Sequence, residues 1–385
     1  MKSIRKITII STAIFCVFLF LFSINFSCVS ICEASYNSTA KGMCLIEKNS
    51  KRIIYSKNEN EKLPMASTTK IVTAITVLQN CDNLEEYIEV DNNCVGVEGT
   101  SIYLRSGELI KVRDLLYGLM LRSGNDAATA LACHVGGSVE GFSTKMNELA
   151  LRAGAKNSNF TNPHGLHDKN HYTTAYDLAL ITAYALNNPI FKEIVSTKTY
   201  VIEATNKSDK RYLTNKNKLL STLDGCCGVK TGFTSKAGRC LVSACERDNT
   251  TMICVVLNCG PMFEESADML NLALDNYKNV KIIDSNKEIY NEYIIDENKG
   301  KLYLYANEDF YYPMKENELN KIKIEYKVNL NDAKEGDEVG EINIFLVDCL
   351  IKNLKLYTMN KIDKLIDSKT LNINEILWEE RINED

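Results

Sequence analysis

The chain has 385 residues, of which 45% are hydrophobic and 25% charged, so it can build one large domain or two moderate ones around a substantial core. Its net charge is −5, and basic residues do not cluster outside the extreme N-terminus. This balance excludes a protein that binds nucleic acid through a basic surface.

The N-terminus has the three parts of a secretory signal peptide. A short basic head, residues 1–6, precedes an almost wholly apolar run, 7–26, and small residues end the segment at Ala34. We therefore predict a signal peptide over residues 1–34, cleaved after Ala34, and export to the outer face of the cytoplasmic membrane or the cell wall. The alternative is an uncleaved membrane anchor, because the apolar run is long enough to span a bilayer.

Fourteen cysteines are scattered through the chain, and the odd number that follows Ala34 cannot all pair within one molecule. They show no C-x-x-C spacing and the four histidines add no ligand pattern, so no metal site is expected. Among these histidines, His134 is expected to cap a helix or to pack in the core. Cysteines at predicted strand positions are expected to be small buried hydrophobic residues: Cys44, Cys240, Cys245 and Cys254.

The first motif with chemical potential is Ser67-Thr68-Thr69-Lys70, which opens an apolar run that predicts a buried helix over residues 68–79. A lysine three residues after a serine projects from the same helix face one turn along, so its amine can reach the serine hydroxyl. A desolvated lysine can then act as the base that turns the hydroxyl into a nucleophile. Taken alone the motif is weak, because S-x-x-K is common by chance.

A second motif, Ser123-Gly124-Asn125, falls between helices predicted over residues 112–121 and 126–133. Gly124 and Asn125 suit a turn, which would present a hydroxyl and an amide at a fixed point. The simpler interpretation is an ordinary turn between two helices, with Asn125 capping the second one.

The third motif, Lys230-Thr231-Gly232, precedes the strand-like stretch 239–244. On a strand edge, Gly232 would let a substrate backbone approach closely. Lys230 would supply a cation for an anionic group, and Thr231 a hydroxyl beside it. By itself the motif could equally be a solvated basic strand end.

Apolar alternation predicts two β-hairpins, one from residues 43–46 and 52–55 and the other from 239–245 and 251–257. With the strand that carries the third motif, they would form a five-stranded antiparallel sheet. Helices are predicted between them at residues 68–79, 112–121, 126–133, 139–153 and 175–186, and a last helix at 264–277. Strands at both ends with helices between them indicate an α+β fold, one sheet flanked by helices.

In this order, S-x-x-K, S-x-N and K-T-G resemble the motifs of the serine penicillin-recognising enzymes. Longer stretches at residues 64–71, 121–128, 162–166 and 229–234 look like those of the low-molecular-weight D-alanyl-D-alanine carboxypeptidases, which are penicillin-binding proteins. The resemblance covers residues 36–279 and continues more weakly into the family's small second domain. It implies the family's catalytic fold, and peptidoglycan stem pentapeptides ending in D-Ala-D-Ala as the substrate.

After residue 279 the composition changes to short alternating strands, such as 301–305, 321–326 and 341–345. The predicted organisation is a signal peptide (1–34), a catalytic penicillin-binding domain (35–280), a small β-rich domain (281–358) and a tail (359–385). Residues 350–366 can be read as an amphipathic helix that contacts a membrane peripherally, although the acidic end of the chain opposes this. The alternative is a last strand and helix that pack on the second domain.

The resemblance also implies roles for the motif residues, with no metal and no cofactor. Ser67 would attack the carbonyl of the penultimate D-alanine, and Lys70, kept neutral by burial and by Lys230, would take its proton. Ser123 and Lys230 would pass a proton to the departing D-alanine. The backbone amides of Ser67 and Phe233 are the expected oxyanion hole. The substrate-binding residues would be Asn125, Thr231, Gly232, Phe233, Thr234 and Lys216.

Two positions depart from the family pattern. Relatives often carry an arginine where this chain has Lys216, and a lysine cannot form the bidentate contact that an arginine makes with a carboxylate. Relatives can also carry an arginine after the last strand, where this chain has residues 260–265. The grip on the substrate carboxylate is therefore expected to be weaker or differently built.

A serine β-lactamase is the nearest rival enzyme. The well-known branch of those enzymes activates the deacylating water with a glutamate between the second and third motifs. This chain has no glutamate between Glu148 and Glu193, so β-lactam antibiotics are expected to be covalent inhibitors that leave a long-lived adduct. A sensor or scaffold without turnover is the other alternative, and the three intact motifs favour an enzyme. The sequence indicates no oligomeric state.

Overall fold

The computed structural model describes residues 36–287, 289–295, 298–328, 334–359 and 371–373. The chain divides into two compact units, of which the larger extends to Asp284 and includes residues 308–319. The predicted signal peptide and nearly all of the predicted tail lie outside the described residues. No helix within the described ranges combines the length and the hydrophobicity that crossing a bilayer requires.

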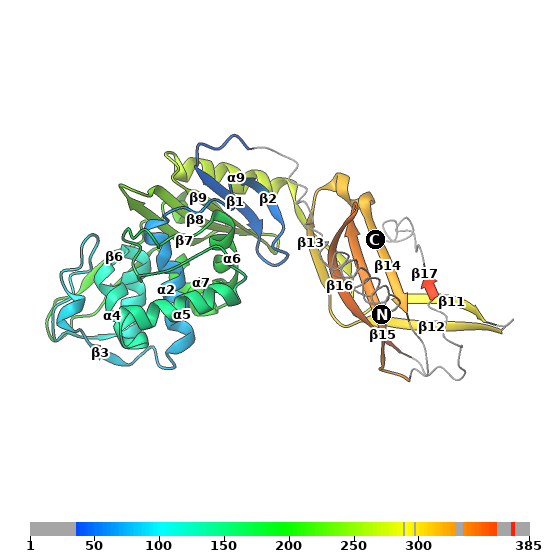
Figure 1. Ribbon diagram of the computed structural model, residues 1–385, viewed down its shortest axis with the longest axis horizontal. Coiled ribbons are helices and arrows are strands. Elements are labelled where there is room, and N and C mark those ends of the chain that lie inside the picture. Colours follow the sequence, from blue (N-terminus) through cyan, green and yellow to red (C-terminus); the bar gives the residue numbers. More distant parts are fainter. Residues whose placement is uncertain (1–35, 288, 296–297, 329–333, 360–370, 374–385) are drawn as a thin grey trace, which may run out of the picture. The chain divides into compact units, whose positions relative to one another are not determined.

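A five-stranded antiparallel sheet forms the centre of the larger unit, as predicted (Figure 1). The order β2-β1-β9-β8-β7 pairs β1 with β9, so strands far apart in the sequence lie side by side in the middle of the sheet. The four cysteines predicted in strands are buried, as expected. The strands are β1 (Gly42–Glu47), β2 (Ile53–Lys57), β7 (Cys226–Thr234), β8 (Gly238–Arg247) and β9 (Thr250–Leu257).

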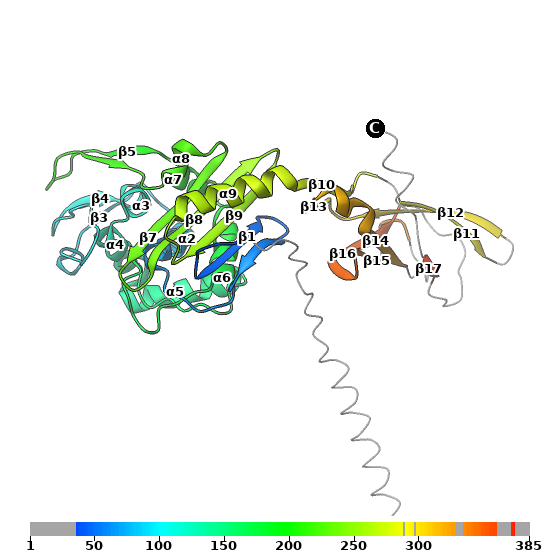
Figure 2. The same cartoon turned by 90° about the horizontal axis from the view of Figure 1, so that it is seen from above.

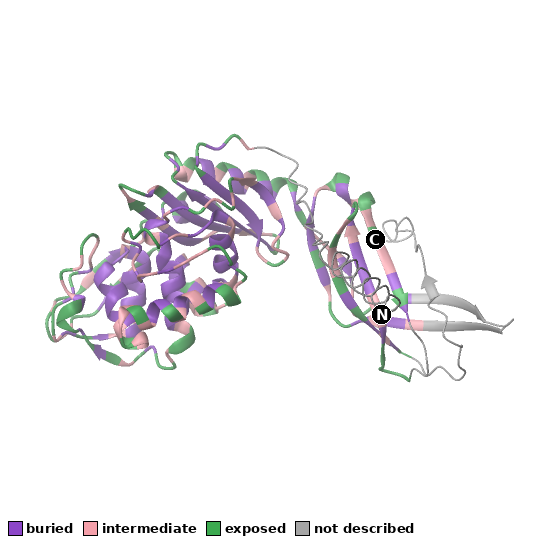
Figure 3. Cartoon of the chain, viewed as in Figure 1, coloured by how far each residue is buried: buried purple, intermediate pink, exposed green. Residues whose placement is uncertain are grey.

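Both faces of this sheet are covered, because each strand sends alternate side chains to opposite faces. On one face, Ile253 and Val255 join the core formed by the main helices. On the other, Cys254 and Val256 pack in a second core with α9 (Met262–Asn276). Figures 2 and 3 show the sheet with α9 and the concentration of buried residues in the sheet and the main helices. The main helices are α2 (Lys70–Asn80), α4 (Asn125–Gly136), α5 (Val139–Arg152), α6 (Ala175–Ala185) and α7 (Pro189–Ser196).

Short polar side chains start three of these helices. The side-chain oxygens of Ser138, Thr174 and Asn188 accept hydrogen bonds from backbone amides in the first turns of α5, α6 and α7. Such caps satisfy amides that have no partner within a helix. α5 and α6 correspond to predicted helices, whereas α7 was not predicted.

The helical segments next to the first two motifs are less regular than predicted. A 3₁₀ turn, η1 (Ala66–Thr69), precedes α2, so Ser67 lies on this turn and Lys70 begins the helix. The segment predicted as one helix over residues 112–121 is α3 (Val112–Tyr117) followed by the π-helical turn η3 (Gly118–Arg122).

Short elements that the alternation did not reveal complete the larger unit. β3 pairs with β4, β5 with β6, and β10 with β13, each antiparallel. They are β3 (Tyr87–Glu89), η2 (Asn92–Cys94), β4 (Leu109–Lys111), β5 (Thr199–Ile202), β6 (Arg211–Thr214), α8 (Leu219–Thr222), β10 (Lys278–Ile283), β13 (Phe310–Met314) and η4 (Glu316–Lys321), the last reaching into the smaller unit.

The smaller unit is β-rich, as predicted, with the strand order β11-β12-β16-β15-β14-β17. The interpretation of residues 350–366 as an amphipathic helix is wrong for the part that the structure describes, because residues up to Thr358 belong to β16. There Leu354, Leu356 and Thr358 are buried and alternate with more exposed residues, which is the period of a strand. The strands are β11 (Ile289–Ile295), β12 (Asn298–Ala306), β14 (Ile322–Val328), β15 (Glu338–Leu346), β16 (Cys349–Thr358) and β17 (Leu371–Ile373).

A buried ion pair fixes the segment 308–319 to the first hairpin. The Arg52 guanidinium donates to both carboxylate oxygens of Glu318 and to the carbonyl oxygen of Pro313, and it lies 5.1 Å from the ring centroid of Tyr277 and 5.2 Å from that of Tyr312. Burial by itself would raise the pKa of Glu318, but its hydrogen bonds with Arg52 bring that pKa below the ordinary value.

The variant Glu318→Ala should destabilise the protein by about 3–5 kcal/mol, because it leaves the guanidinium of Arg52 buried without a counter-ion. Urea unfolding would measure the loss. Glu61→Ala is the matched control, since Glu61 pairs with Lys41 at 2.8 Å on the surface and its removal should cost less than about 1 kcal/mol. Equal losses in the two variants would contradict the structural role given to Arg52.

Candidate active site

All three motifs meet at one cavity of about 370 Å³ beside β7. Three segments that the motifs do not include, at Thr100, at Lys216 and at the start of α9, complete its wall. The cavity is lined by Ser67, Thr100, Ser123, Lys216, Thr231, Gly232, Phe233, Met262 and Phe263. Six residues that the sequence nominated are therefore brought together on one surface, while Lys70, Lys230, Asn125 and Thr234 are not part of the lining.

Lys70 is buried behind the cavity lining, and its amine contacts the Ser67 hydroxyl. The 3₁₀ turn η1 places Ser67 one turn before Lys70, and the Lys70 Nζ atom lies 3.1 Å from Ser67 Oγ. The predicted proximity of amine and hydroxyl is therefore confirmed. Lys70 is fully buried, and its Nζ also donates to Asn125 Oδ1 and to the carbonyl oxygen of His164, both at 2.7 Å.

Burial, followed by neighbouring cations, lowers the pKa of each of the three lysines of the site. Burial lowers the pKa of Lys70 well below the ordinary lysine value, and the charges of Lys230 and then Lys216 lower it further. Burial, followed by the charge of Lys216, lowers the pKa of Lys230 to about 7. Burial and Arg122 lower the pKa of Lys216. The site therefore makes it easier for these amines to lose their protons than for a free lysine.

The second motif forms the predicted turn between helical segments. Ser123 has φ 65°, a left-handed conformation that is uncommon for a residue with a side chain, and it is buried at the cavity. The Asn125 carboxamide is occupied on both sides, accepting from Lys70 and donating to the carbonyl oxygen of Glu98 at 2.5 Å. In this structure Asn125 therefore orients the Lys70 amine, and its contact with a substrate stays a prediction.

Gly232 allows two backbone segments to touch. A Cβ atom at Gly232 would lie 3.0 Å from the carbonyl oxygen of Met65 and 3.1 Å from the amide nitrogens of Ser67 and Thr68. The sequence assigned this close approach to a substrate, whereas in the structure the neighbour is the turn that carries Ser67. Phe233, which follows, is 68% exposed at the cavity. The Thr234 hydroxyl does not line the cavity and accepts a hydrogen bond from the Ala237 amide at 3.0 Å.

Residues 162–166 form a support under Lys70 that the motifs alone did not reveal. Besides the His164 carbonyl, the Pro163 carbonyl oxygen accepts from Thr73 Oγ1 of α2 at 2.6 Å. Gly165 has φ +89°, and a Cβ there would lie 1.9 Å from the carbonyl oxygen of Ala66. Burial and the charge of Lys70 lower the pKa of His164 to about 3, so its imidazole is neutral.

Two buried acids that were not predicted from the sequence stabilise segments next to Thr100 and Lys216, which line the cavity. Asp126 accepts from Ser101 Oγ at 2.5 Å and from the backbone amides of Ile102 and Leu104, which fixes the segment after Thr100. Glu108 pairs with Arg211 at 2.7 Å just before the segment that carries Lys216. The only signal for Asp126 was an acid in the first turn of a predicted helix.

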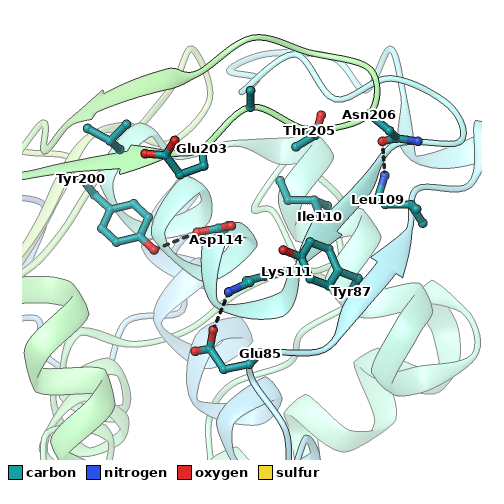
Figure 4. Close-up of a pocket in the computed structure, with 12 residues that line it drawn as sticks. Glu85, Tyr87, Leu109, Ile110, Lys111, Asp114, Tyr200, Glu203, Thr205 and Asn206 are labelled. Atoms are coloured by element: carbon teal, nitrogen blue, oxygen red, sulfur yellow. Dashed lines mark hydrogen bonds and ion pairs between the residues drawn. The ribbon is translucent and has the colours of Figure 1, made fainter.

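A second cavity of about 520 Å³ contains no motif residue (Figure 4). Its charged side chains are engaged in hydrogen bonds or ion pairs. The Lys111 amine donates to Glu85 at 2.9 Å, the Tyr200 hydroxyl to Asp114 at 2.8 Å, and the Leu109 amide to Asn206 at 2.8 Å. Although it is the larger of the two, it presents no arrangement of a nucleophile and a base.

Comparisons with known proteins agree with the geometry of the first cavity. The family model described as D-alanyl-D-alanine carboxypeptidase matches residues 30–260, and the model of the penicillin-binding protein 5 C-terminal domain matches residues 277–364. The D-alanyl-D-alanine carboxypeptidase DacF of Bacillus subtilis is 32% identical over 318 residues, covering 79% of this chain and 80% of that protein. The solved structure of penicillin binding protein 5 from Haemophilus influenzae has a TM-score of 0.72 and 28% identity, covering 85% and 98% of the two chains. That of the D-alanyl-D-alanine carboxypeptidase DacD from Francisella tularensis has a TM-score of 0.70 and 26% identity, covering 86% and 96%.

The chain has a helix-flanked antiparallel sheet, and the serine and lysine of its S-x-x-K motif lie on the turn and helix beside the edge strand β7. These features define the class of serine penicillin-recognising enzymes. The predicted fold class is therefore confirmed. Within this class the chain belongs to the D-alanyl-D-alanine carboxypeptidase family, whose members are serine-type carboxypeptidases. The resemblance inferred from the motifs is confirmed as well.

The variant Gly232→Ala should react with labelled penicillin at least about a hundredfold more slowly than the unmodified protein, because the added methyl group pushes β7 away from the turn that carries Ser67. Gel fluorescence of the labelled protein would measure the rate. Gly260→Ala is the matched control, because a Cβ at Gly260 meets no atom within 4 Å and labelling should be unchanged. Normal labelling of Gly232→Ala would contradict the close approach.

Proposed function

We propose that the protein removes the terminal D-alanine from peptidoglycan stem peptides through an acyl-enzyme on Ser67, and that β-lactam antibiotics inhibit it by acylating the same serine. The observation that carries this proposal is the buried amine of Lys70 at 3.1 Å from the Ser67 hydroxyl. Membership of the carboxypeptidase family supports the choice of substrate.

The hydrogen bonds of Lys70 support its role as the base. A neutral amine has two N–H bonds and one lone pair. The Asn125 and His164 carbonyl oxygens, each at 2.7 Å, can accept both N–H bonds, which leaves the lone pair for the hydroxyl of Ser67. Ser67 Oγ would then bond to the carbonyl carbon of the penultimate D-alanine while its proton moves to Lys70 Nζ.

Charge develops on the carbonyl oxygen during this attack. The backbone amides of Ser67 and Phe233 are the proposed donors, and the short distance between the Gly232 position and the Ser67 amide supports their closeness. The η1–α2 segment begins at this point, so the partial positive charge of a helix start favours the oxyanion as well.

Departure of D-alanine requires a proton on its nitrogen. Lys230, with a pKa of about 7, can both hold and release a proton near neutral pH, and Ser123, whose residue lines the cavity, is the proposed hydroxyl relay. The C–N bond breaks, free D-alanine leaves, and water then hydrolyses the ester on Ser67 with Lys70 again as base. The substrate-binding residues are proposed as predicted from the sequence: Asn125, Thr231, Gly232, Phe233, Thr234 and Lys216.

The proposal includes export of the protein to the cell wall, where stem peptides are found. It rests on the N-terminal basic and apolar segments that indicate a signal peptide over residues 1–34. The proposed organisation of the remaining chain is a catalytic domain over 35–280, a β-rich domain over 281–358 and a tail over 359–385.

The variant Ser67→Ala should release no D-alanine from a pentapeptide that ends in D-Ala-D-Ala, while the unmodified protein releases one equivalent. Mass spectrometry of the digest would follow the reaction, and Ser221→Ala, at an exposed serine, is the control with full activity. D-alanine release by Ser67→Ala would refute the assigned nucleophile. No release by the unmodified protein, with Ser67 still reactive toward penicillin, would favour the scaffold alternative.

Acylation by penicillin should speed up as the pH rises through the pKa of Lys70, because only the neutral amine is a base. The charge of Lys216 lowers this pKa, so Lys216→Met should raise it and move the rising part of the pH–rate profile to higher pH. Lys218→Met, two residues away and not among the charges that shift Lys70, should leave the position of the profile unchanged. A profile that stays in place in Lys216→Met would contradict the proposed coupling.

A further inference from the structure

Three side chains with different donor atoms converge at the ends of α2 and α4 that lie away from the cavity. Cys81 directly follows α2, Glu86 precedes β3, and His134 lies in the last turn of α4. Cys81 Sγ lies 3.3 Å from Glu86 Oε1, and His134 Nε2 lies 2.9 Å from the same oxygen. All three atoms lie within 4.8 Å of one another.

We propose that Cys81, Glu86 and His134 bind a zinc ion. Thiolate, imidazole and carboxylate are the three ligand types that zinc takes in proteins, and a set mixing all three suits zinc better than calcium or magnesium, which prefer oxygen alone. Binding would release the thiol proton to solvent, since only the thiolate coordinates. No step of the proposed peptidase reaction uses this site.

Two of the three distances between donor atoms are close to those that this ion requires, and the third, between the Cys81 sulfur and His134 Nε2, lies within 4.8 Å. Bonds of about 2.0–2.3 Å in a tetrahedral site separate neighbouring ligand atoms by roughly 3.3–3.7 Å. The sulfur–oxygen distance of 3.3 Å already agrees, and the nitrogen–oxygen distance of 2.9 Å needs to open by only a few tenths of an ångström. The fourth ligand of the zinc ion would be either a solvent water or the backbone oxygen of Asn83, which lies 3.6 Å from the Cys81 sulfur.

An ion can reach this site from solution. The side chain of His134 is 30% exposed and that of Glu86 is 39% exposed. Of the two expectations for His134, packing in the core is wrong, because its side chain is partly exposed in the last turn of α4. The three residues were not recognised from the sequence, because His134 follows Glu86 by 48 positions and the set has no recognised ligand spacing.

The position of the site suggests its effect. α2 begins with Lys70 and α4 with Asn125, and these two residues share a hydrogen bond at the cavity. A zinc ion would join the opposite ends of the same two helices through one ligand from each and a third from the loop between α2 and β3. It would thereby stabilise the helix pair without contributing to the chemistry.

Cobalt(II) is the first probe, because a thiolate ligand gives it a charge-transfer band in the near ultraviolet. The purified full-length protein should bind one equivalent with this band, and zinc should displace it. The variants Cys81→Ser and His134→Ala should bind zinc at least about a hundredfold more weakly in competition with a chromophoric chelator, and Cys81→Ser should lose the band.

Cys133→Ser is the matched control, since this partly buried cysteine is the neighbour of His134 but does not belong to the set. It should keep the band, and zinc should raise the melting temperature of this control and of the unmodified protein but not that of Cys81→Ser. Penicillin labelling of all variants without metal verifies that they fold. Absence of one-equivalent binding, a band that survives in Cys81→Ser, or loss of the band in Cys133→Ser would overturn the proposal.

Discussion

The buried amine of Lys70 is the constraint on which the rest of the site depends. An ammonium group is costly to bury without a counter-ion, and two further lysines increase that cost here. The amine can remain buried because two carbonyl oxygens, from Asn125 and His164, accept its hydrogens at 2.7 Å. Since these oxygens come from α4 and from the loop 162–166, both segments must be in place before the amine can face Ser67.

The positions of two glycines follow from the same requirement. The turn that carries Ser67 is held between the loop 162–166 on one side and β7 on the other. A Cβ at Gly165 would lie 1.9 Å from the Ala66 carbonyl oxygen, and one at Gly232 would lie 3.0 Å from that of Met65. Backbone therefore contacts backbone on both sides of the nucleophile, which leaves the Ser67 side chain little freedom. The glycine of the third motif is, on this view, as much a part of the scaffold as of the substrate surface.

Local pattern was enough to predict the sheet, its hairpins, most of the main helices and the proximity of Ser67 and Lys70, because periodicity and one helical turn fix these features. It was not enough for contacts made by backbone atoms or by distant segments. The carbonyl of His164 carries no side-chain signal, and Asp126 resembles any acid at a helix start. For residues 350–358 the sequence left both a helix and a strand open for a related reason, since Leu350, Leu354 and Tyr357 fit a helical arc while burial follows Leu354 and Leu356. Short runs of this kind satisfy both periods, and only the neighbouring strand β15 decides between them.

If relatives carry an arginine at position 216, as the family resemblance implies, Lys216 would change more than the geometry of the proposed carboxylate contact. An arginine keeps its charge at any working pH, whereas burial and Arg122 lower the pKa of Lys216, so its charge depends on its surroundings. A substrate carboxylate bound beside Lys216 and Lys230 would raise the pKa of both amines and so favour their charged forms. The pKa of Lys70 responds in turn to the charges of these two lysines. It follows, on the proposed roles, that binding of the anionic end of a peptide and readiness of the base are coupled through the protonation of three lysines, a coupling that a permanently charged arginine would reduce.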